Sequence, residues 1–198
     1  MNHVQCKIFL IVSLLMSASY ASQTKPIVCK QEYALCTSAP CIPDPRHPNY
    51  AICACVVLNG NSVGYKDCKQ RLPKQDPFNV KQVISTFSFE QFKTKKSMTC
   101  AKGTPWTNCV DAPCTVDPMD PTKSICSCKI SHDQAYFTFG GGCDTTTCTT
   151  GFWSGATSSA GTLLRNALLA VTQNPSKSVD NHCTSINSKQ SLKGDHSL

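Results

Sequence analysis

Cysteine is the residue whose number and spacing give this chain the most chemical potential, with 15 copies in 198 residues. Twelve of them fall into two sets of six, and the intervals from the second to the fifth cysteine are identical in both sets. Ala-Pro precedes, and Asp-Pro follows, the third cysteine of each set. The pattern predicts two copies of one module. The sets are Cys29, Cys36, Cys41, Cys53, Cys55 and Cys68, and Cys100, Cys109, Cys114, Cys126, Cys128 and Cys143.

Thiols this close together can form disulfides, bind a soft metal ion or act as a redox pair. The pairs Cys53/Cys55 and Cys126/Cys128 lie two residues apart, so on a strand both members point to one face. Structural zinc sites usually contain Cys-x-x-Cys, and a redox dithiol needs that spacing at the start of a helix. The chain lacks this spacing. We therefore predict disulfides, with no metal and no cofactor.

The positions of two Pro-rich turns predict part of the pairing. A hairpin folded about residue 46 or 47 places Cys41 opposite Cys53, and one folded about residue 120 places Cys114 opposite Cys126. The remaining cysteines are paired with sequence neighbours or, for the last two, with each other. These expected bridges are Cys29–Cys36, Cys55–Cys68, Cys100–Cys109, Cys128–Cys143 and Cys148–Cys183.

Residues 1–21 have the pattern of a secretory signal peptide. Lys7 precedes an apolar run from Ile8 to Met16, and small residues follow at a cleavage site ending in Ala21. The run is too short for a membrane span, which needs roughly 20 apolar residues. Removal of the segment leaves fourteen cysteines, an even number that suits complete pairing in an oxidising compartment. We expect a secreted or periplasmic, cysteine-rich protein without a membrane span.

The sequence gives little support for a hydrolase active site. Nucleophilic hydrolysis needs a Ser or Cys with a histidine base and an orienting carboxylate. Ser154 lies between glycines 151 and 155, but the Gly-x-Ser-x-Gly spacing is absent. None of the histidines repeats between the modules. The four that follow the predicted signal peptide are His47, His132, His182 and His196. We expect no enzyme, and a small secreted hydrolase using Ser154 or a histidine is kept as an alternative.

Basic residues concentrate in the segment 69–99 between the modules, which holds seven Lys or Arg and two Asp or Glu. Such a connector can contact an anionic surface, although a solvated linker is the simpler interpretation. The aromatic side chains nearby are not interleaved with the basic ones as in a platform for nucleic-acid bases. We expect no nucleic acid here and one strand through Val83–Phe89.

Short strands must position the cysteines. We predict a small disulfide-rich, mainly β fold with two tandem three-stranded meander modules, at 22–68 and 100–143, and one C-terminal α-helix. A tight turn is expected at Asn59–Asn61, where Asn-Gly favours positive φ. The expected strands are Tyr33–Ser38, Tyr50–Leu58 and Ser62–Lys66, and Trp106–Asp111, Ser124–Ser131 and Ala135–Phe139.

The last part of the chain departs from the repeat. Residues 144–184 hold a Thr-rich segment and a helical pattern over Ser158–Thr172, and residues 185–198 have the composition of a disordered tail. Three to four turns are marginal for an isolated helix, so the helix must dock through its apolar face. That face is expected to contain Leu163, Leu164, Ala167, Leu168 and Val171.

The favoured function is an exported, disulfide-stabilised binding or interaction protein, with an unknown protein or glycan as its ligand. An exposed aromatic patch would carry the binding. The first alternative is a secreted inhibitor of a hydrolase that presents its Pro-rich turns, with Arg46 or Met119 at a rigid, exposed tip. The candidates for the patch are Trp106, Tyr136, Phe137, Phe152 and Trp153.

Overall fold

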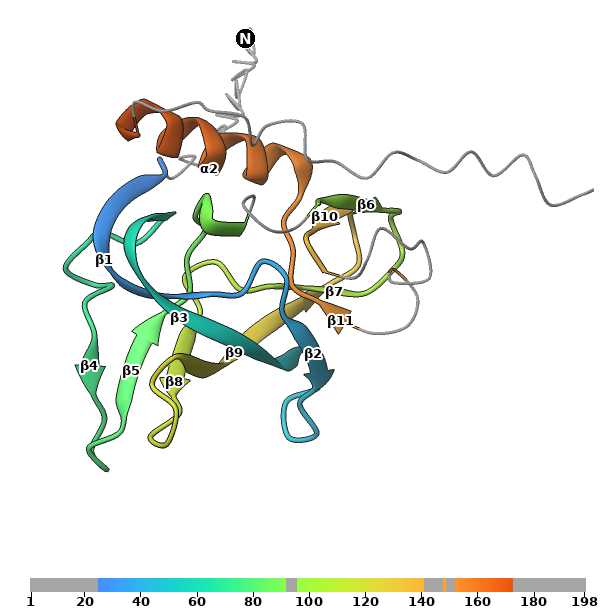
Figure 1. Ribbon diagram of the computed structural model, residues 1–198. Helices are drawn as coiled ribbons and strands as arrows, with labels where there is room; N and C mark the ends of the chain where they lie inside the picture. The colour runs from blue at the N-terminus through green and yellow to red at the C-terminus, as the bar shows by residue number, and fades with distance from the viewer. Residues whose placement is uncertain (1–24, 92–95, 141–147, 149–151, 173–198) are drawn as a thin grey trace, which may run out of the picture.

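The structure is a computed structural model that describes residues 25–91, 96–140, 148 and 152–172. It is mainly β and rich in disulfides, as predicted. The described strands form a nine-stranded sheet, in which β11-β2-β3-β9-β8-β5-β4 lie side by side, and a separate two-stranded sheet, β10-β6 (Figure 1). Strand β1 also pairs with β3, and β7 with β9.

The elements follow the chain in a simple order. The first half contains β1 (Ile27–Leu35), β2 (Pro40–Pro43) and β3 (Tyr50–Gly64), and the connector contains β4 (Lys74–Gln75) and β5 (Lys81–Ile84). The second half contains β6 (Met98–Cys100), β7 (Trp106–Asn108), β8 (Pro113–Val116), β9 (Lys123–Ser131) and β10 (Tyr136–Thr138). Strand β11 (Phe152–Trp153) and helix α2 (Ser158–Val171) complete the described chain.

Strand β3 is much longer than expected, because the turn predicted at Asn59–Asn61 does not form. Asn59 pairs with Glu32 of β1 and Gly60 pairs with Gln31, so β3 continues without a break. Gly60 has a φ of 150°, a conformation that residues with a side chain rarely adopt, so the glycine allows the ladder to continue through this position. A ladder with β1 along its whole length therefore overrides the local turn preference of Asn-Gly. The expected strand at 62–66 becomes the end of β3.

The strand pairing of the second half repeats that of the first. In β2–β3 Cys41 lies opposite Cys53, and in β8–β9 Cys114 lies opposite Cys126, so both partners are shifted by 73 residues. The pairs β1–β3 and β7–β9 show the same shift. Strands β3 and β9 are antiparallel neighbours with Cys53 opposite Cys126. A local two-fold axis therefore passes between these two cysteines, and the halves share one sheet.

The third strands of the two expected meanders differ from this common plan. Strand β10 covers part of the predicted Ala135–Phe139 strand, but it pairs with β6 in the small sheet instead of returning to β9. Strand β5 overlaps the predicted connector strand Val83–Phe89 at residues 83 and 84 and pairs with the edge of β8, so this part of the connector belongs to the sheet. Arg71 within it is completely buried. The interpretation of residues 69–99 as a solvated linker is therefore wrong for this part.

Disulfides fill the inner side of the central sheet. Cys41–Cys53 and Cys114–Cys126 are present, as the hairpin register predicted, each with a Cα–Cα distance of 4.1 Å. The other five predicted pairs are wrong, namely the four between sequence neighbours, Cys29–Cys36, Cys55–Cys68, Cys100–Cys109 and Cys128–Cys143, and the pair of the last two cysteines, Cys148–Cys183. The structure instead forms Cys29–Cys68, Cys36–Cys55, Cys109–Cys128 and Cys100–Cys148.

The bridges of the first half follow from the strand pairing. Strand β1 runs antiparallel to β3 with Leu35 opposite Val56, so Cys36 arrives beside Cys55. The start of β1 meets the end of β3, which brings Cys29 to Cys68. In the second half Cys148 forms a disulfide with Cys100, so the predicted Cys148–Cys183 bridge across the helix cannot form. Cys143, Cys183, the predicted signal peptide and the predicted tail lie outside the described residues.

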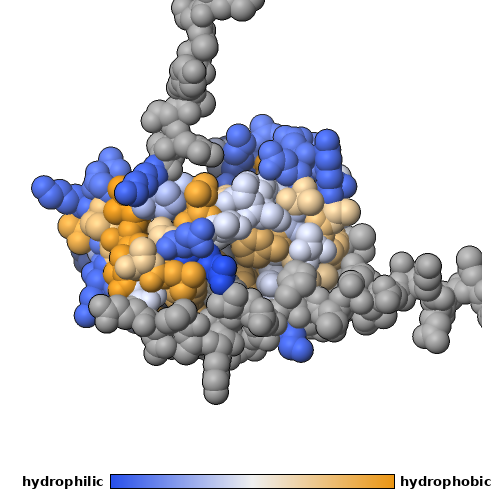
Figure 2. All heavy atoms as spheres, turned by 90° about the horizontal axis from the view of Figure 1, so that it is seen from above, coloured by the Kyte–Doolittle hydropathy of each residue, from blue (hydrophilic) through white to orange (hydrophobic). Residues whose placement is uncertain are grey.

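Helix α2 forms where the apolar periodicity predicted it. Thr157 is its N-cap and accepts a hydrogen bond from Ala160 N at 3.3 Å. Leu164 and Leu168 are buried in a cluster with Val63, Phe87 and Phe139. Leu163 and Val171, expected on the buried face, are exposed. Figure 2 views the molecule from above Figure 1 and shows hydrophobic and hydrophilic residues side by side on that face. Neither α2 nor any other helix of the described residues has the length and apolarity of a membrane span.

Candidate functional site

The predicted aromatic patch does not form on the surface. Trp106 and Tyr136 are buried and stack with ring centroids 5.3 Å apart, next to the Cys100–Cys148 bridge. Phe137, Phe152 and Trp153 are half-buried. Phe137 lies against Gly161 of α2, and Trp153 lies against Gly140. These side chains join the small sheet and the helix to the main sheet, so they serve the core.

The residues considered for hydrolysis are not assembled either. Ser154 is buried, its N–H donates to Ala39 O at 3.1 Å, and its carbonyl accepts from Thr138 Oγ1 at 2.7 Å. His47 lies on an exposed turn, where its Nδ1 is 3.0 Å from Asp44 Oδ2. His132 is also exposed, whereas positions 182 and 196 lie outside the described residues. Within the described chain, no histidine contacts Ser154.

The clustered cysteines are already committed to bridges. Two groups of three Sγ atoms lie within 4.8 Å of one another, namely Cys36, Cys114 and Cys126, and Cys53, Cys109 and Cys128. All six sulfurs belong to disulfides, so none is a thiolate that can ligate a metal. Bridges from the two halves are in contact, because Cys36 Sγ lies 3.3 Å from Cys126 Sγ and Cys53 Sγ lies 3.6 Å from Cys109 Sγ.

Three exposed turns share one sequence pattern, Asp-Pro followed by a large side chain. The third residue of each pattern is exposed and is here called a tip residue. The tip residues are Arg46 after β2, Phe78 between β4 and β5, and Met119 between β8 and β9. The exposed fraction is 85% for Phe78 and 92% for Met119. These are the two largest values among the exposed large hydrophobic residues. Apolar side chains of this size with so little cover are candidates for contact with a partner.

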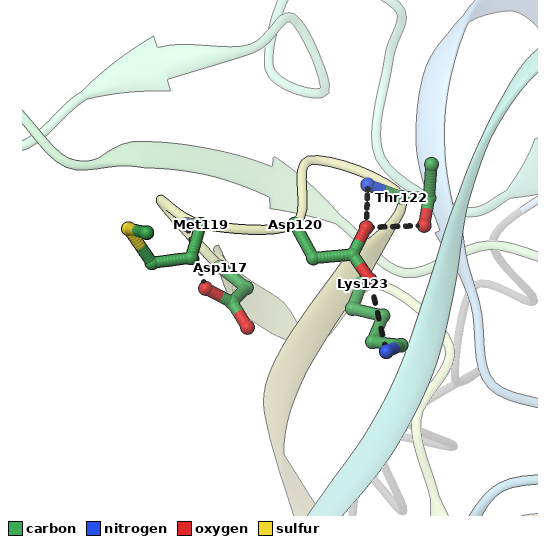
Figure 3. Close-up of polar contacts among 5 residues, drawn as sticks. All are labelled: Asp117, Met119, Asp120, Thr122 and Lys123. Atoms are coloured by element: carbon green, nitrogen blue, oxygen red, sulfur yellow. Dashed lines mark hydrogen bonds and ion pairs between the residues drawn. The ribbon is translucent and has the colours of Figure 1, made fainter.

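The turn that carries Met119 is closed by hydrogen bonds (Figure 3). Asp117 N donates to Lys123 O at 2.9 Å, and Met119 N donates to Asp117 Oδ1 at 2.8 Å. Asp120 Oδ1 accepts from Thr122 N at 3.1 Å and from Thr122 Oγ1 at 2.6 Å. Pro118 and Pro121 fix φ within the same turn. The Cys114–Cys126 bridge joins the two strands directly behind it, so Met119 stands on a rigid support.

An ion pair completes this turn. Lys123 Nζ lies 2.9 Å from Asp120 Oδ2. This contact, together with the two hydrogen bonds from Thr122, lowers the pKa of Asp120 to about 2. The same contact raises the pKa of Lys123. Both groups are therefore charged at neutral pH, and the turn keeps its internal bonds there.

The turn that carries Phe78 has the same kind of internal support. Asp76 Oδ1 accepts from Phe78 N at 2.9 Å and from Val80 N at 2.8 Å, while Asp76 N donates to Val80 O at 3.0 Å. Strands β5 and β8 are antiparallel, with Gln82 opposite Thr115. The turn before β5 and the turn after β8 therefore leave the sheet at the same end, as Figure 1 shows. Phe78 and Met119 lie at the ends of neighbouring hairpins.

The third turn is the equivalent of the Met119 turn in the first half, with Arg46 at the position of Met119. Arg46 N donates to Asp44 Oδ1 at 2.9 Å, and Asp44 N donates to Tyr50 O at 2.9 Å. The Arg46 N–H and the His47 ring both lower the pKa of Asp44. The same backbone arrangement thus presents a cation in one half and a thioether in the other.

The comparisons with known proteins add no relative, since no family model, no curated protein and no solved structure matches the chain. The interpretation of the site therefore rests on its geometry. Arg46 and Met119 were recognised from the sequence as possible tips, but Phe78 was not. The signal was present, because Asp76-Pro77-Phe78 repeats the Asp-Pro pattern within the connector.

Proposed function

We propose that the protein is an exported, non-catalytic binding protein that contacts a protein partner through Met119 and Phe78 on their preformed turns. The observation that carries the proposal is the 92% exposure of Met119 on a turn fixed by hydrogen bonds, two prolines and a disulfide. Six bridges among the described cysteines support an extracellular or periplasmic location, where disulfides persist.

Because the turns are rigid, binding through the tip residues has a smaller entropic cost. A flexible loop must be ordered when it binds, which costs about 0.5–1.5 kcal/mol for each immobilised side chain, and backbone ordering adds to this. Here the turn backbone is already held by Asp76 and by Asp117. Methionine and aromatic residues are also enriched where protein interfaces are fully buried. Two such side chains on neighbouring turns fit a partner with adjacent apolar pockets.

The charges of the turns help to select the kind of partner. Four carboxylates, those of Asp44, Asp76, Asp117 and Asp120, stand against two permanent cations, Arg46 and Lys123. An anionic membrane would repel this end of the molecule. A protein surface that surrounds apolar pockets with neutral or basic groups is complementary to it.

The inhibitor alternative uses the same tip residues but also requires free backbone N–H groups in the turns. A substrate-like inhibitor donates backbone N–H groups to the edge strands of a hydrolase cleft. The N–H groups of Arg46 and Met119 already donate to Asp44 and Asp117. An inhibitor of that kind would have to break these two hydrogen bonds before it bound. We therefore favour contact through the side chains of the tip residues. The hydrolase alternative gains no support from the buried Ser154.

The test uses photo-methionine in place of methionine. After the predicted signal peptide the chain contains two methionines, Met98 and Met119, and Met98 is buried. The labelled protein is irradiated in the extracellular fluid of its source cells. We expect a saturable adduct with one protein that is absent from a Met119→Leu variant, in which the buried Met98 is the sole label and serves as the control.

Competition decides whether the adduct reflects the proposed contact. Excess unlabelled wild-type protein should abolish it, whereas an excess of the Phe78→Asp/Met119→Asp double variant should not. Equal competition by the two proteins, or an adduct that persists in Met119→Leu, would overturn the proposal. If the captured partner is a hydrolase, loss of its activity in excess wild-type protein would favour the inhibitor alternative.

A further inference from the structure

A groove separate from the turn tips crosses the edge of the sheet near β4 and β5. One part, with a volume of about 370 Å³, is lined by Lys66, Gln70, Leu72, Lys74 and Gln82 among others. A second depression shares Gln70 and Lys74 with the first and extends it past Lys69. The groove therefore runs along the start of the connector, a segment to which the sequence assigns most of the positive charge.

The groove lining carries more positive than negative charge. Lys66, Lys69 and Lys74 are exposed, and Asp67 is the acidic residue among the lining side chains. Asp67 Oδ1 accepts a hydrogen bond from Gln70 N at 3.0 Å. Lys66 Nζ donates to the backbone carbonyl of Asp111 at 2.9 Å, which holds its ammonium in place. Within the described residues, none of the three lysines forms an ion pair with a carboxylate.

The other lining groups suit hydroxyl-rich ligands. Gln70 and Gln82 offer amide donors and acceptors, as hydroxyl groups require. Leu72 and Pro113 provide small apolar surfaces against which the C–H face of a sugar ring can pack. Ammonium groups, amides and apolar patches along one open channel match a chain of sugars with regularly spaced negative charges. We infer that this groove binds an anionic polysaccharide, bearing carboxylate or sulfate groups.

Two other anionic polymers are less well matched. Single-stranded nucleic acid is normally bound with aromatic side chains that stack on the bases, and the groove lining contains no aromatic residue. An anionic bilayer needs a convex apolar or amphipathic surface, whereas these lysines line a concave channel. Both become outcomes of the test.

The test measures binding of full-length mature protein to defined polymers by isothermal titration calorimetry. The probes are a sulfated glycosaminoglycan oligosaccharide, oligogalacturonate and neutral dextran. The variant Lys69→Ala/Lys74→Ala removes two groove charges, and Lys102→Ala/Lys129→Ala removes two exposed lysines elsewhere, so both variants have the same net charge. Equal thermal unfolding temperatures verify that both fold.

We expect at least one of the two anionic polymers to bind and dextran not to bind. The groove variant should weaken binding about 30-fold, if each lysine near an anionic polymer contributes about 1 kcal/mol. The control variant should change affinity less than about threefold. Equal weakening by both variants would show diffuse attraction and overturn the inference. It is equally overturned if neither anionic polymer binds, if dextran binds as well, or if single-stranded DNA or phosphatidylserine vesicles bind more tightly through the same lysines.

Discussion

Among single residues, Arg71 differs most from what its sequence position suggests. The connector around it is basic, and exposed lysines are its neighbours in sequence. In the structure Arg71 is completely buried, donates to Ile27 O at 2.8 Å and contacts Cys29 Sγ. Burial lowers the pKa of Arg71, and the nearby Asp111 carboxylate opposes that shift. The composition of the connector could not reveal that Arg71 is buried. The site forms only where Arg71 meets β1, the end of β3 and the loop that holds Asp111, and both Ile27 and Asp111 are 40 or more residues away from Arg71 in the sequence.

Gly64 makes room for this buried charge. A Cβ atom at residue 64 would overlap Asp111 Oδ1 and lie 3.2 Å from Arg71 Nη1. We predict that Gly64→Ala lowers the free energy of unfolding by about 1–3 kcal/mol, the usual range for overpacking. Urea denaturation of the oxidised protein measures the change. In an Asp111→Gly background the cost of Gly64→Ala should be smaller, and an unchanged cost would show that the carboxylate is not the obstacle.

Asp120 provides a pH test of the Met119 turn. Its folded-state pKa of about 2 lies below the ordinary value of 3.8, so the stabilisation from its contacts is fully present above about pH 4. That stabilisation is lost as the pH falls through about 2. Carbon-detected NMR titration should give a midpoint near 2 for the Asp120 carboxyl. In Lys123→Met the midpoint should rise toward 3.8, and an unmoved midpoint would exclude the ion pair as a cause.

At the scale of elements, local signals predicted what local interactions determine. The helix forms where the apolar period indicated it, and the hairpins at Cys41–Cys53 and Cys114–Cys126 followed from turn position alone. The turn at Asn59–Asn61 failed because β1 supplies a continuous partner for β3. The prediction of the buried helix face was only partly correct, since Leu163 and Val171 are exposed. The apolar character of these two residues did not indicate whether a neighbouring element would cover them.

Gly161 sets how closely α2 approaches the small sheet. Glycine to alanine in an exposed helix interior stabilises by about 1 kcal/mol. Here the new methyl group would overlap the Phe137 ring, so we predict that Gly161→Ala destabilises the protein by about 1–3 kcal/mol. Urea denaturation gives the sign. Phe137→Leu in the same chain should restore much of the loss, whereas a stabilising Gly161→Ala would show that the contact yields easily.

At the scale of the whole molecule, the sequence repeat predicted two modules but not how they join. The pairing of β3 with β9 brings together residues 67 to 79 positions apart, and the inner side of that pair is filled by bridges from both halves. Long-range pairing of the same kind brings Cys36 to Cys55, outside the reach of any turn-based rule. The turns that carry Arg46 and Met119 could be predicted from the sequence because Asp and Pro preferences act over about four residues.

The complete cysteine inventory is testable on the intact protein. Six bridges occupy twelve of the fourteen cysteines that remain after the predicted cleavage, and the other two, Cys143 and Cys183, lie outside the described residues. The predicted complete pairing then requires a Cys143–Cys183 bridge. Mass spectrometry of an unreduced digest should find this linked peptide and no alkylated thiol. Stoichiometric labelling of either cysteine in the denatured, unreduced protein would contradict it.

The position of Cys53 opposite Cys126 determines how the two halves associate. Each of these residues faces its own equivalent, so the seam between β3 and β9 has the isologous geometry of a homodimer interface. Because both halves lie in one chain, their association is unimolecular and does not depend on concentration. The two halves also differ in sequence, so equivalent places on opposite sides of this seam carry different side chains, Arg46 in one half and Met119 in the other.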